Sequence, residues 1–317
     1  MLDHRQIAAL IVLPLAATGV ICNWTVAIII RRLPSMQNAF GRLTSSQSIG
    51  DATHSSLFLF YYVPMCLFNS SFLMKYSEHC GHLLLIAYDI STYSHLFISL
   101  NRFCAIYRPV QYEQIFSKRN TNLTIVFSWV VAIFPTFYYY VYKDCRFIYL
   151  DNFWAFVFTT TPICQKITWY ADFLKYNSIV CMIVVIDVIT VSKVRNFKQK
   201  VTGVVCKSHA KKKRNEINFL KQACLQAAVF LVELVTYFII TPIVTDEYKW
   251  GRFFLSTFAW VFVRSYEIIT ISFNKEVLEY IFGKILQDKM PSRLSFITRA
   301  RTSSDVIQHP KNPSSIH

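Results

Sequence analysis

Charged side chains stand inside stretches of this sequence that otherwise carry almost no charge. The acidic ones are Asp51, Asp89, Asp187, Glu233 and Glu267, and Arg264 stands in the same surroundings. A carboxylate in apolar surroundings is costly unless it pairs with a cation, accepts hydrogen bonds or holds a proton. Such groups can carry a proton or an ion, or can act as a conformational switch. Arg264 and Glu267 lie one helical turn apart and are able to pair.

The sequence contains no residue pattern that is typical of an enzyme active site or of a metal site. The nine cysteines form no CxxC pair, and the eight histidines form no HxxxH pair. These are spacings that zinc sites and metal-dependent hydrolases use. No nucleophile motif is present either. We therefore predict a protein that is not an enzyme and that binds no metal.

The composition indicates a membrane protein. Apolar residues make up 54% of the 317 residues and aromatic residues 16%, which exceeds the usual apolar share of soluble domains. A net charge of +15 could suggest nucleic acid as a partner, but the basic residues fall between apolar runs and not on one compact domain. Membrane lipids are therefore the expected partner, and nucleic acid is not.

Seven apolar stretches are long enough to cross a bilayer as helices. They lie near residues 7–30, 43–68, 82–106, 124–141, 173–191, 219–244 and 253–273. Residues 274–286 carry apolar side chains on one helical face and are predicted to form a short amphipathic eighth helix at the interface. These elements form one domain, residues 1–286, and the tail 287–317 is predicted to be disordered and cytoplasmic. The expected fold is an all-α membrane protein, a seven-transmembrane-helix bundle.

The distribution of lysine and arginine predicts the orientation of this bundle. Ten basic residues lie between positions 193 and 221, and Arg31, Arg32 and Arg42 flank the first loop, whereas only six residues precede the first helix. Loops rich in Lys and Arg stay in the cytoplasm. The amino terminus is therefore predicted to lie outside and the carboxyl terminus inside.

A single arginine closes the third apolar stretch. The segment Asn101-Arg102-Phe103 is followed by Tyr107, Pro109 and Tyr112. An arginine at a helix end can simply reach water, or it can neutralise an acid on a neighbouring helix. The tyrosines and the proline that follow make the pattern more specific.

This segment resembles the third-helix arginine motif of rhodopsin-like G-protein-coupled receptors. Its form Ser-Leu-Asn-Arg-Phe-Cys-Ala-Ile-Tyr is closer to the nematode serpentine chemoreceptors of class X, and the resemblance covers about residues 16–283. It implies that a heterotrimeric G protein is the partner and that coupling uses Asn101, Arg102, Phe103, Tyr107, Pro109 and Tyr112. Because residue 101 is asparagine where the family usually has an acid, Arg102 needs another acid at rest. The available ones are Asp187, Asp51 and Glu216.

Two further positions match the family in part. Asn23 and Asp51, 28 residues apart, resemble the inward polar pair of the first two helices, with Tyr266 and Thr270 of the seventh helix expected nearby. Simple glue between helices is an equally good interpretation of this pair. The family's Asn-Pro-x-x-Tyr signature is missing, because Tyr266, Glu267 and Thr270 occupy its three defining positions.

The outer side of the bundle is predicted to carry a lid at about residues 142–170. Cys80, Cys145 and Cys164 all lie on this oxidising side, so one of them stays without a partner in the chain. The resemblance implies a bridge from Cys80 to Cys145 or Cys164, and a Cys145–Cys164 bridge within the lid is equally open. Asn69 begins the one glycosylation sequon that is well placed. Asp89 is interpreted as a buried structural acid and not as a ligand-binding one.

Two functions fit these features. The first is a G-protein-coupled chemosensory receptor for an unidentified small molecule, in the plasma membrane or that of sensory cilia, with the ligand in the outer cavity between helices. The second is a transporter that uses the intramembrane carboxylates, but no inverted repeat or glycine-interrupted half-helix supports it. No lysine occurs within 253–273, so the Schiff-base link of opsins to retinal is not expected, and no cofactor is predicted.

Overall fold

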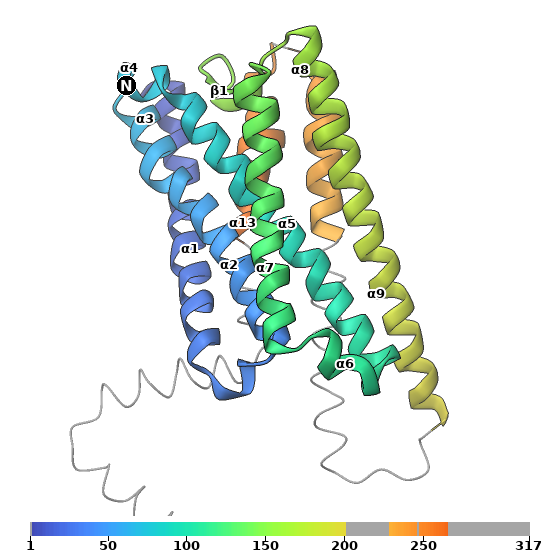
Figure 1. Cartoon of the computed structure of the whole chain (residues 1–317). Helices are drawn as coiled ribbons and strands as arrows, with labels where there is room; N and C mark the ends of the chain where they lie inside the picture. The colour runs from blue at the N-terminus through green and yellow to red at the C-terminus, as the bar shows by residue number, and fades with distance from the viewer. Residues whose placement is uncertain (1, 201–227, 246, 266–317) are drawn as a thin grey trace, which may run out of the picture. The chain divides into compact units, whose positions relative to one another are not determined.

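The computed structural model describes residues 2–200, 228–245 and 247–265 (Figure 1). Several predicted features lie outside this part of the chain: most of the basic loop with Glu216, the positions Tyr266, Glu267 and Thr270, the amphipathic helix 274–286 and the tail 287–317. Four of the described helices are long and apolar enough to span a membrane: His4–Arg32, Ser77–Tyr107, Lys118–Tyr140 and Pro162–Val194. A shorter apolar helix runs from Ala228 to Ile243.

Each of the seven predicted stretches contains helix in the described residues. The first four are α1 (His4–Arg32), α2 (Ala39–Leu57) with its continuation α3 (Val63–Leu67), α5 (Ser77–Tyr107) and α7 (Lys118–Thr136). The next are α8 (Pro162–Ile167) with α9 (Lys175–Lys200), the helix 228–243, and α12 (Lys249–Phe253) with α13 (Ala259–Arg264). Short helices α4 (Ser71–Lys75) and α6 (Pro109–Ile115) lie in connections.

π-Helical turns join several of these segments into continuous helices. They are Phe58–Tyr62, Phe137–Tyr142, Thr168–Leu174, Thr236–Ile240 and Phe254–Phe258. The fifth of the seven predicted helices begins at Pro162, earlier than the predicted start at residue 173. The Thr161 hydroxyl accepts a hydrogen bond from the backbone N–H of Cys164 at 3.2 Å, and proline at the first helical position is favourable because its missing N–H has no helical partner there.

Helix α2 is unusually polar and lies between α1 and α5. Its buried residues include Ser45, Ser46, Ser48, Asp51, His54 and Ser55. At Gly50 an added Cβ would stand 2.9 Å from the Ala87 carbonyl oxygen of α5, so glycine permits close helix contact here. The Ser46 and Ser94 hydroxyls bond at 3.0 Å across this contact. This close packing brings the carboxylate of Asp51 on α2 next to α5.

The predicted lid contains a β-hairpin that was not expected in an all-α protein. Strands β1 (Phe147–Leu150) and β2 (Ala155–Phe158) are antiparallel, with Phe147 opposite Phe158 and Leu150 opposite Ala155. The aromatic residues of this segment favour strands, and Asp151 and Asn152 suit the turn between them. The carbonyl of Phe147 lies where a side chain at Gly81 of α5 would stand. The hairpin therefore rests directly on α5.

Side chains from distant elements fasten the hairpin. Asp151 pairs with Arg5 of α1 at 3.1 Å, and the Tyr149 hydroxyl donates to Asp151 at 3.0 Å. Burial raises the pKa of Tyr149 far above its usual value, so this phenol is a neutral donor. Thr257 and Tyr62 both donate to the Trp154 carbonyl, at 3.1 and 2.7 Å. The amino terminus, the hairpin and α8 lie at one end of the bundle, and α6 lies at the other (Figure 1).

Candidate functional site

Arg264 of α13 lies at the centre of a buried charge cluster. Its side chain is 2% exposed, and its Nη1 atom donates to Asp51 Oδ1 of α2 at 3.1 Å. The same nitrogen donates to the Ser91 hydroxyl of α5 at 3.0 Å, and Nη2 reaches Glu233 Oε2 of the helix 228–243 at 3.4 Å. One guanidinium therefore joins four helices.

Aromatic rings and a backbone contact complete the surroundings of Arg264. Its guanidinium carbon lies 4.2 Å from the ring centre of Tyr88 and 4.1 Å from that of Phe230, a geometry that favours a cation. Asn23 of α1 donates to the Arg264 carbonyl at 3.0 Å. Two carboxylates share one cation here, and the low dielectric makes each of these contacts strong.

The structure places Asn23 and Asp51 around Arg264, which the sequence reasoning did not identify as their partner. The residues expected beside them, Tyr266 and Thr270, lie outside the described part, as does Glu267, the expected partner of Arg264. The sequence did contain a signal for this cluster: charges of opposite sign in different apolar stretches. Spacing within one helix favoured a local pair and did not reveal contacts between helices.

A second charge cluster lies nearer the hairpin. Lys175 of α9 donates to both carboxylate oxygens of Asp89, at 2.8 and 3.1 Å, and lies 3.9 Å from Asp172. The Tyr140 hydroxyl donates to Asp172. Asp89 is buried and held by a lysine of its own protein, so its contacts agree with the structural interpretation. Lys175 and Asp172 were not singled out from the sequence, although their spacing places them one helical turn apart.

A pocket lies beside these two clusters and under the hairpin. Its empty volume is about 450 Å³, part of it open to solvent. The lining is mainly aromatic and apolar, with two carboxylates: Tyr88, Phe147, Phe158, Asp172, Tyr176, Glu233, Leu234, Tyr237, Phe238 and Trp260 are among its residues. An apolar pocket with a few converging polar groups is the usual form of a small-molecule site.

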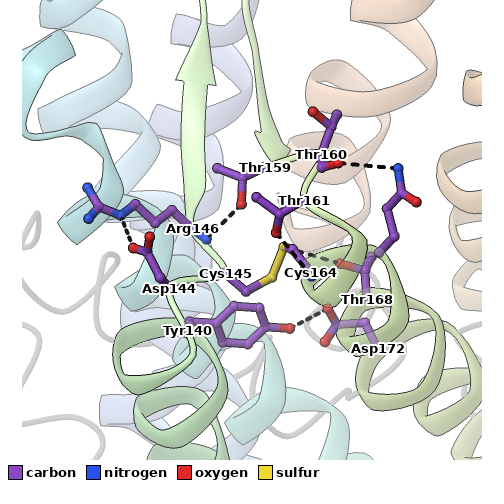
Figure 2. Close-up of a disulfide and its surroundings, with 11 residues drawn as sticks. Tyr140, Asp144, Cys145, Arg146, Thr159, Thr160, Thr161, Cys164, Thr168 and Asp172 are labelled. Atoms are coloured by element: carbon purple, nitrogen blue, oxygen red, sulfur yellow. Dashed lines mark hydrogen bonds and ion pairs between the residues drawn. A yellow bond between two sulfur atoms is a disulfide. The ribbon is translucent and has the colours of Figure 1, made fainter.

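One disulfide is present among the described residues, and it joins Cys145 to Cys164 (Figure 2). The bridge ties the loop before β1 to the first turn of α8. Cys80 is buried and is a free cysteine. Of the three pairings that the sequence left open, the structure therefore contains the one within the lid.

Replacing either cysteine of this bridge with serine should lower stability equally. A closed loop with a sequence separation of 19 predicts a loss of about 3 kcal/mol by the loop-entropy relation. Cys145→Ser, Cys164→Ser and the double variant should therefore share one lowered midpoint of thermal unfolding. Cys80→Ser, which leaves the bridge intact, should lower it less. A larger effect of Cys80→Ser, or a Cys80 peptide cross-linked to the lid in non-reducing mass spectrometry, would contradict this pairing.

At the opposite end, Arg102 of α5 faces α9. Its Nη2 atom lies 3.7 Å from Asp187 Oδ1 and 3.3 Å from the Ser99 hydroxyl, which itself donates to Asp187 at 3.1 Å. Asp187 is 1% exposed and Arg102 13%. Of the three acids named as partners for Arg102, the structure thus places Asp187 beside it, Asp51 is bonded to Arg264, and Glu216 lies outside the described residues.

The other residues of the Arg102 motif make contacts between α5, α6 and α9. Asn101 donates from Nδ2 to the Tyr112 hydroxyl at 3.1 Å, which ties α5 to α6. Phe103 stacks on Tyr107, with ring centres 4.5 Å apart, and the Tyr107 hydroxyl donates to the Ile189 carbonyl of α9 at 3.4 Å. Pro109 is the first residue of α6. These contacts tie the last turns of α5 to α6 and to α9.

Asn69 lies between α3 and α4 and is exposed. Its φ angle of 50° is a left-handed conformation that asparagine tolerates better than most residues. Helices α3 and α4, which flank Asn69, are at the same end of the bundle as the hairpin (Figure 1).

Comparison with known proteins assigns this architecture to a family. The family model for the "Serpentine type 7TM GPCR chemoreceptor Srx" matches residues 13–274. The chain belongs to this family. Serpentine receptor class X 45 of Caenorhabditis elegans is 31% identical to it over 328 residues, covering 95% of this chain and 89% of the relative. Serpentine receptor class X-43 of the same organism is 25% identical over 286 residues, covering 87% and 86%.

The structure comparison agrees with this assignment at the level of the fold. Squid rhodopsin matches with a TM-score of 0.71 over 98% of this chain and 87% of its own, at 14% sequence identity. This Srx chain therefore has the seven-helix rhodopsin-like fold, which makes it a multi-pass integral membrane protein. It is a G-protein-coupled chemoreceptor and not an enzyme, as the sequence predicted, and none of the comparisons supports the transporter alternative.

Proposed function

We propose that this Srx receptor detects a small molecule in the pocket beneath the hairpin and passes the signal to a heterotrimeric G protein at the Arg102 end. The observation that carries the proposal is the position of Glu233. This carboxylate lines the pocket and also pairs with Arg264. A ligand that contacts Glu233 therefore changes the contacts of the one side chain that joins four helices.

The orientation follows from the same proposal. The hairpin, the disulfide and Asn69 face the outside, where disulfides form and sugars are attached. Arg102 and the basic loop face the cytoplasm, as the positive-inside rule predicts. The plasma membrane, including that of sensory cilia, is the location where such a receptor meets ligands from outside the cell.

Arg102 is proposed to contact the G protein, with the other five motif residues, Asn101, Phe103, Tyr107, Pro109 and Tyr112, shaping the same surface. Its contact with Asp187 is long, at 3.7 Å, and the arginine side chain is 13% exposed. A longer distance weakens an ion pair, so this is proposed to be the contact that opens when Arg102 is released to the G protein. Asn23 and Asp51 are proposed to act through Arg264, because both bond to it.

Filling the pocket should abolish the response to any activating molecule. Leu234 is 2% exposed and lines the pocket, whereas Leu231, one turn away on the same helix, is 41% exposed. Leu234→Trp should lower the response of receptor-expressing cells at least about tenfold, because overpacking removes the space for the ligand. Leu231→Trp is the matched control and should respond normally. Equal responses of both variants, at equal surface expression, would place the ligand elsewhere.

A further inference from the structure

A second hollow lies at the end of the bundle that carries α6, between the last turn of α1, the first turn of α2 and the start of α7. Its empty volume is about 1130 Å³, part of it open to solvent. We call it the basic groove, because Arg31, Arg42 and Lys118 supply all its charged side chains. Its apolar wall on α7 includes Ile125, Val126 and Trp129.

The positive charges of the basic groove are not balanced by the described part of the chain. Among the described residues, no acidic side chain lines the groove, and none of the ion pairs includes any of its three cations. Three like charges around one hollow repel one another. An anion bound there lowers this repulsion.

Neutral groups orient two of these cations. Arg42 donates to the Asn122 side-chain oxygen at 3.4 Å and to the Lys118 carbonyl at 3.3 Å. Arg31 donates from Nε to the Ser45 hydroxyl at 2.9 Å. Basic residues that only set the orientation of a membrane protein need no shared hollow and no fixed position. The held guanidiniums are instead suited to a phosphate, which accepts from arginine in a bidentate manner.

The apolar part of the groove continues onto a surface that faces lipid. Val126 is 60% exposed, and its neighbours Leu123 and Phe127 are 58% and 61% exposed. Such a surface on a membrane-spanning helix is covered by acyl chains. The Trp129 indole donates to Ser46 at 3.0 Å, which fixes its ring against the groove. A positive rim thus adjoins an apolar wall.

We propose that the basic groove binds one anionic phospholipid, with its phosphate at Arg31, Arg42 and Lys118 and an acyl chain along Val126 and Trp129. Basic pockets between membrane helices hold lipid headgroups in this way. The site is separate from the ligand pocket, and the proposal depends neither on the ligand nor on the G protein. It assigns a function to cations that otherwise serve only orientation.

The test uses the full-length receptor in nanodiscs of phosphatidylcholine with a minor share of phosphatidylinositol 4-phosphate. Native mass spectrometry counts the phosphoinositide molecules that stay bound. The triple variant Arg31→Gln/Arg42→Gln/Lys118→Gln should bind at least about tenfold more weakly, because all three cations that attract the phosphate are then missing. The matched control Arg32→Gln/Arg108→Gln/Arg119→Gln loses the same charge at the same end of the bundle, outside the groove, and should bind nearly normally.

A second pair of variants keeps all charges and guards against misfolding of the triple variant. Val126→Trp fills the acyl part of the groove and should also weaken retention of the lipid, whereas Phe127→Trp, at a residue of equal exposure that does not line the groove, should not. If the groove variants and their controls lost equal amounts of bound phosphoinositide, the binding would be a general attraction of the lipid to this end of the receptor, which would overturn the proposal. Undiminished binding in the groove variants, or no retained phosphoinositide in the parent receptor, would overturn it as well.

Discussion

Replacing Arg264 with methionine is expected to lower the free energy of unfolding by about 3–5 kcal/mol, the cost of leaving buried charge without its partner. Asp51 and Glu233 are 5% and 4% exposed in their side chains, and Arg264 is the cation that both contact. Without it, two carboxylates repel each other in the interior. The variant should therefore show a strongly reduced level of folded receptor at the cell surface and a lowered midpoint of thermal unfolding.

Removing the acids together with the arginine should restore folding. In Asp51→Asn/Glu233→Gln/Arg264→Met no buried charge is left unpaired, and replacement of a whole buried charge network is often close to neutral. Arg119→Met, at an exposed arginine, is the control for the loss of one positive charge. If Arg264→Met were as stable as the parent, or if the triple variant were no better than the single one, the cluster would not be the centre of stability described above.

Replacing Arg102 with alanine is expected to remove most G-protein activation while the receptor still reaches the surface. Its guanidinium lies at the end of α5, and its ion pair with Asp187 is longer than the two ion pairs of Arg264, so its loss is expected to disturb folding less than the loss of Arg264. The measurement is nucleotide exchange on purified G protein, without added ligand, by receptor in nanodiscs. This readout does not require that the ligand be known.

The partner of Arg102 provides a test in the opposite direction. Asp187→Asn removes the ion pair and should raise basal exchange, since each ~1 kcal/mol lost from the resting state changes the population about fivefold. The double variant Arg102→Ala/Asp187→Asn should be as inactive as Arg102→Ala, because the freed arginine is then missing. Unchanged exchange in Arg102→Ala at equal surface level would reject the role proposed for this residue.

Local patterns in the chain were sufficient to determine the class of the protein and to locate stretches that contain helix in the described residues. Apolar runs of membrane-spanning length, the bias of Lys and Arg, and the segment around Arg102 depend on neighbours in sequence, so they can be recognised without a fold. The sequence did not predict that the fifth helix begins at Pro162 or that residues 147–158 form a hairpin. The reason is that the lid mixes aromatic and polar residues. Hydropathy alone does not distinguish such a segment from a loop.

Contacts between helices were decided only by the tertiary structure. Arg264 could be paired from sequence only with a residue one turn away, whereas its guanidinium contacts side chains on three other helices. The sequence around Lys175 likewise did not indicate a contact with Asp89 of α5. The choice among three cysteine pairings and the choice of Asp187 as the neighbour of Arg102 depended likewise on how helices rotate and approach. Helical periodicity sets which residues share a face of a helix, but it does not set which face meets which neighbouring helix.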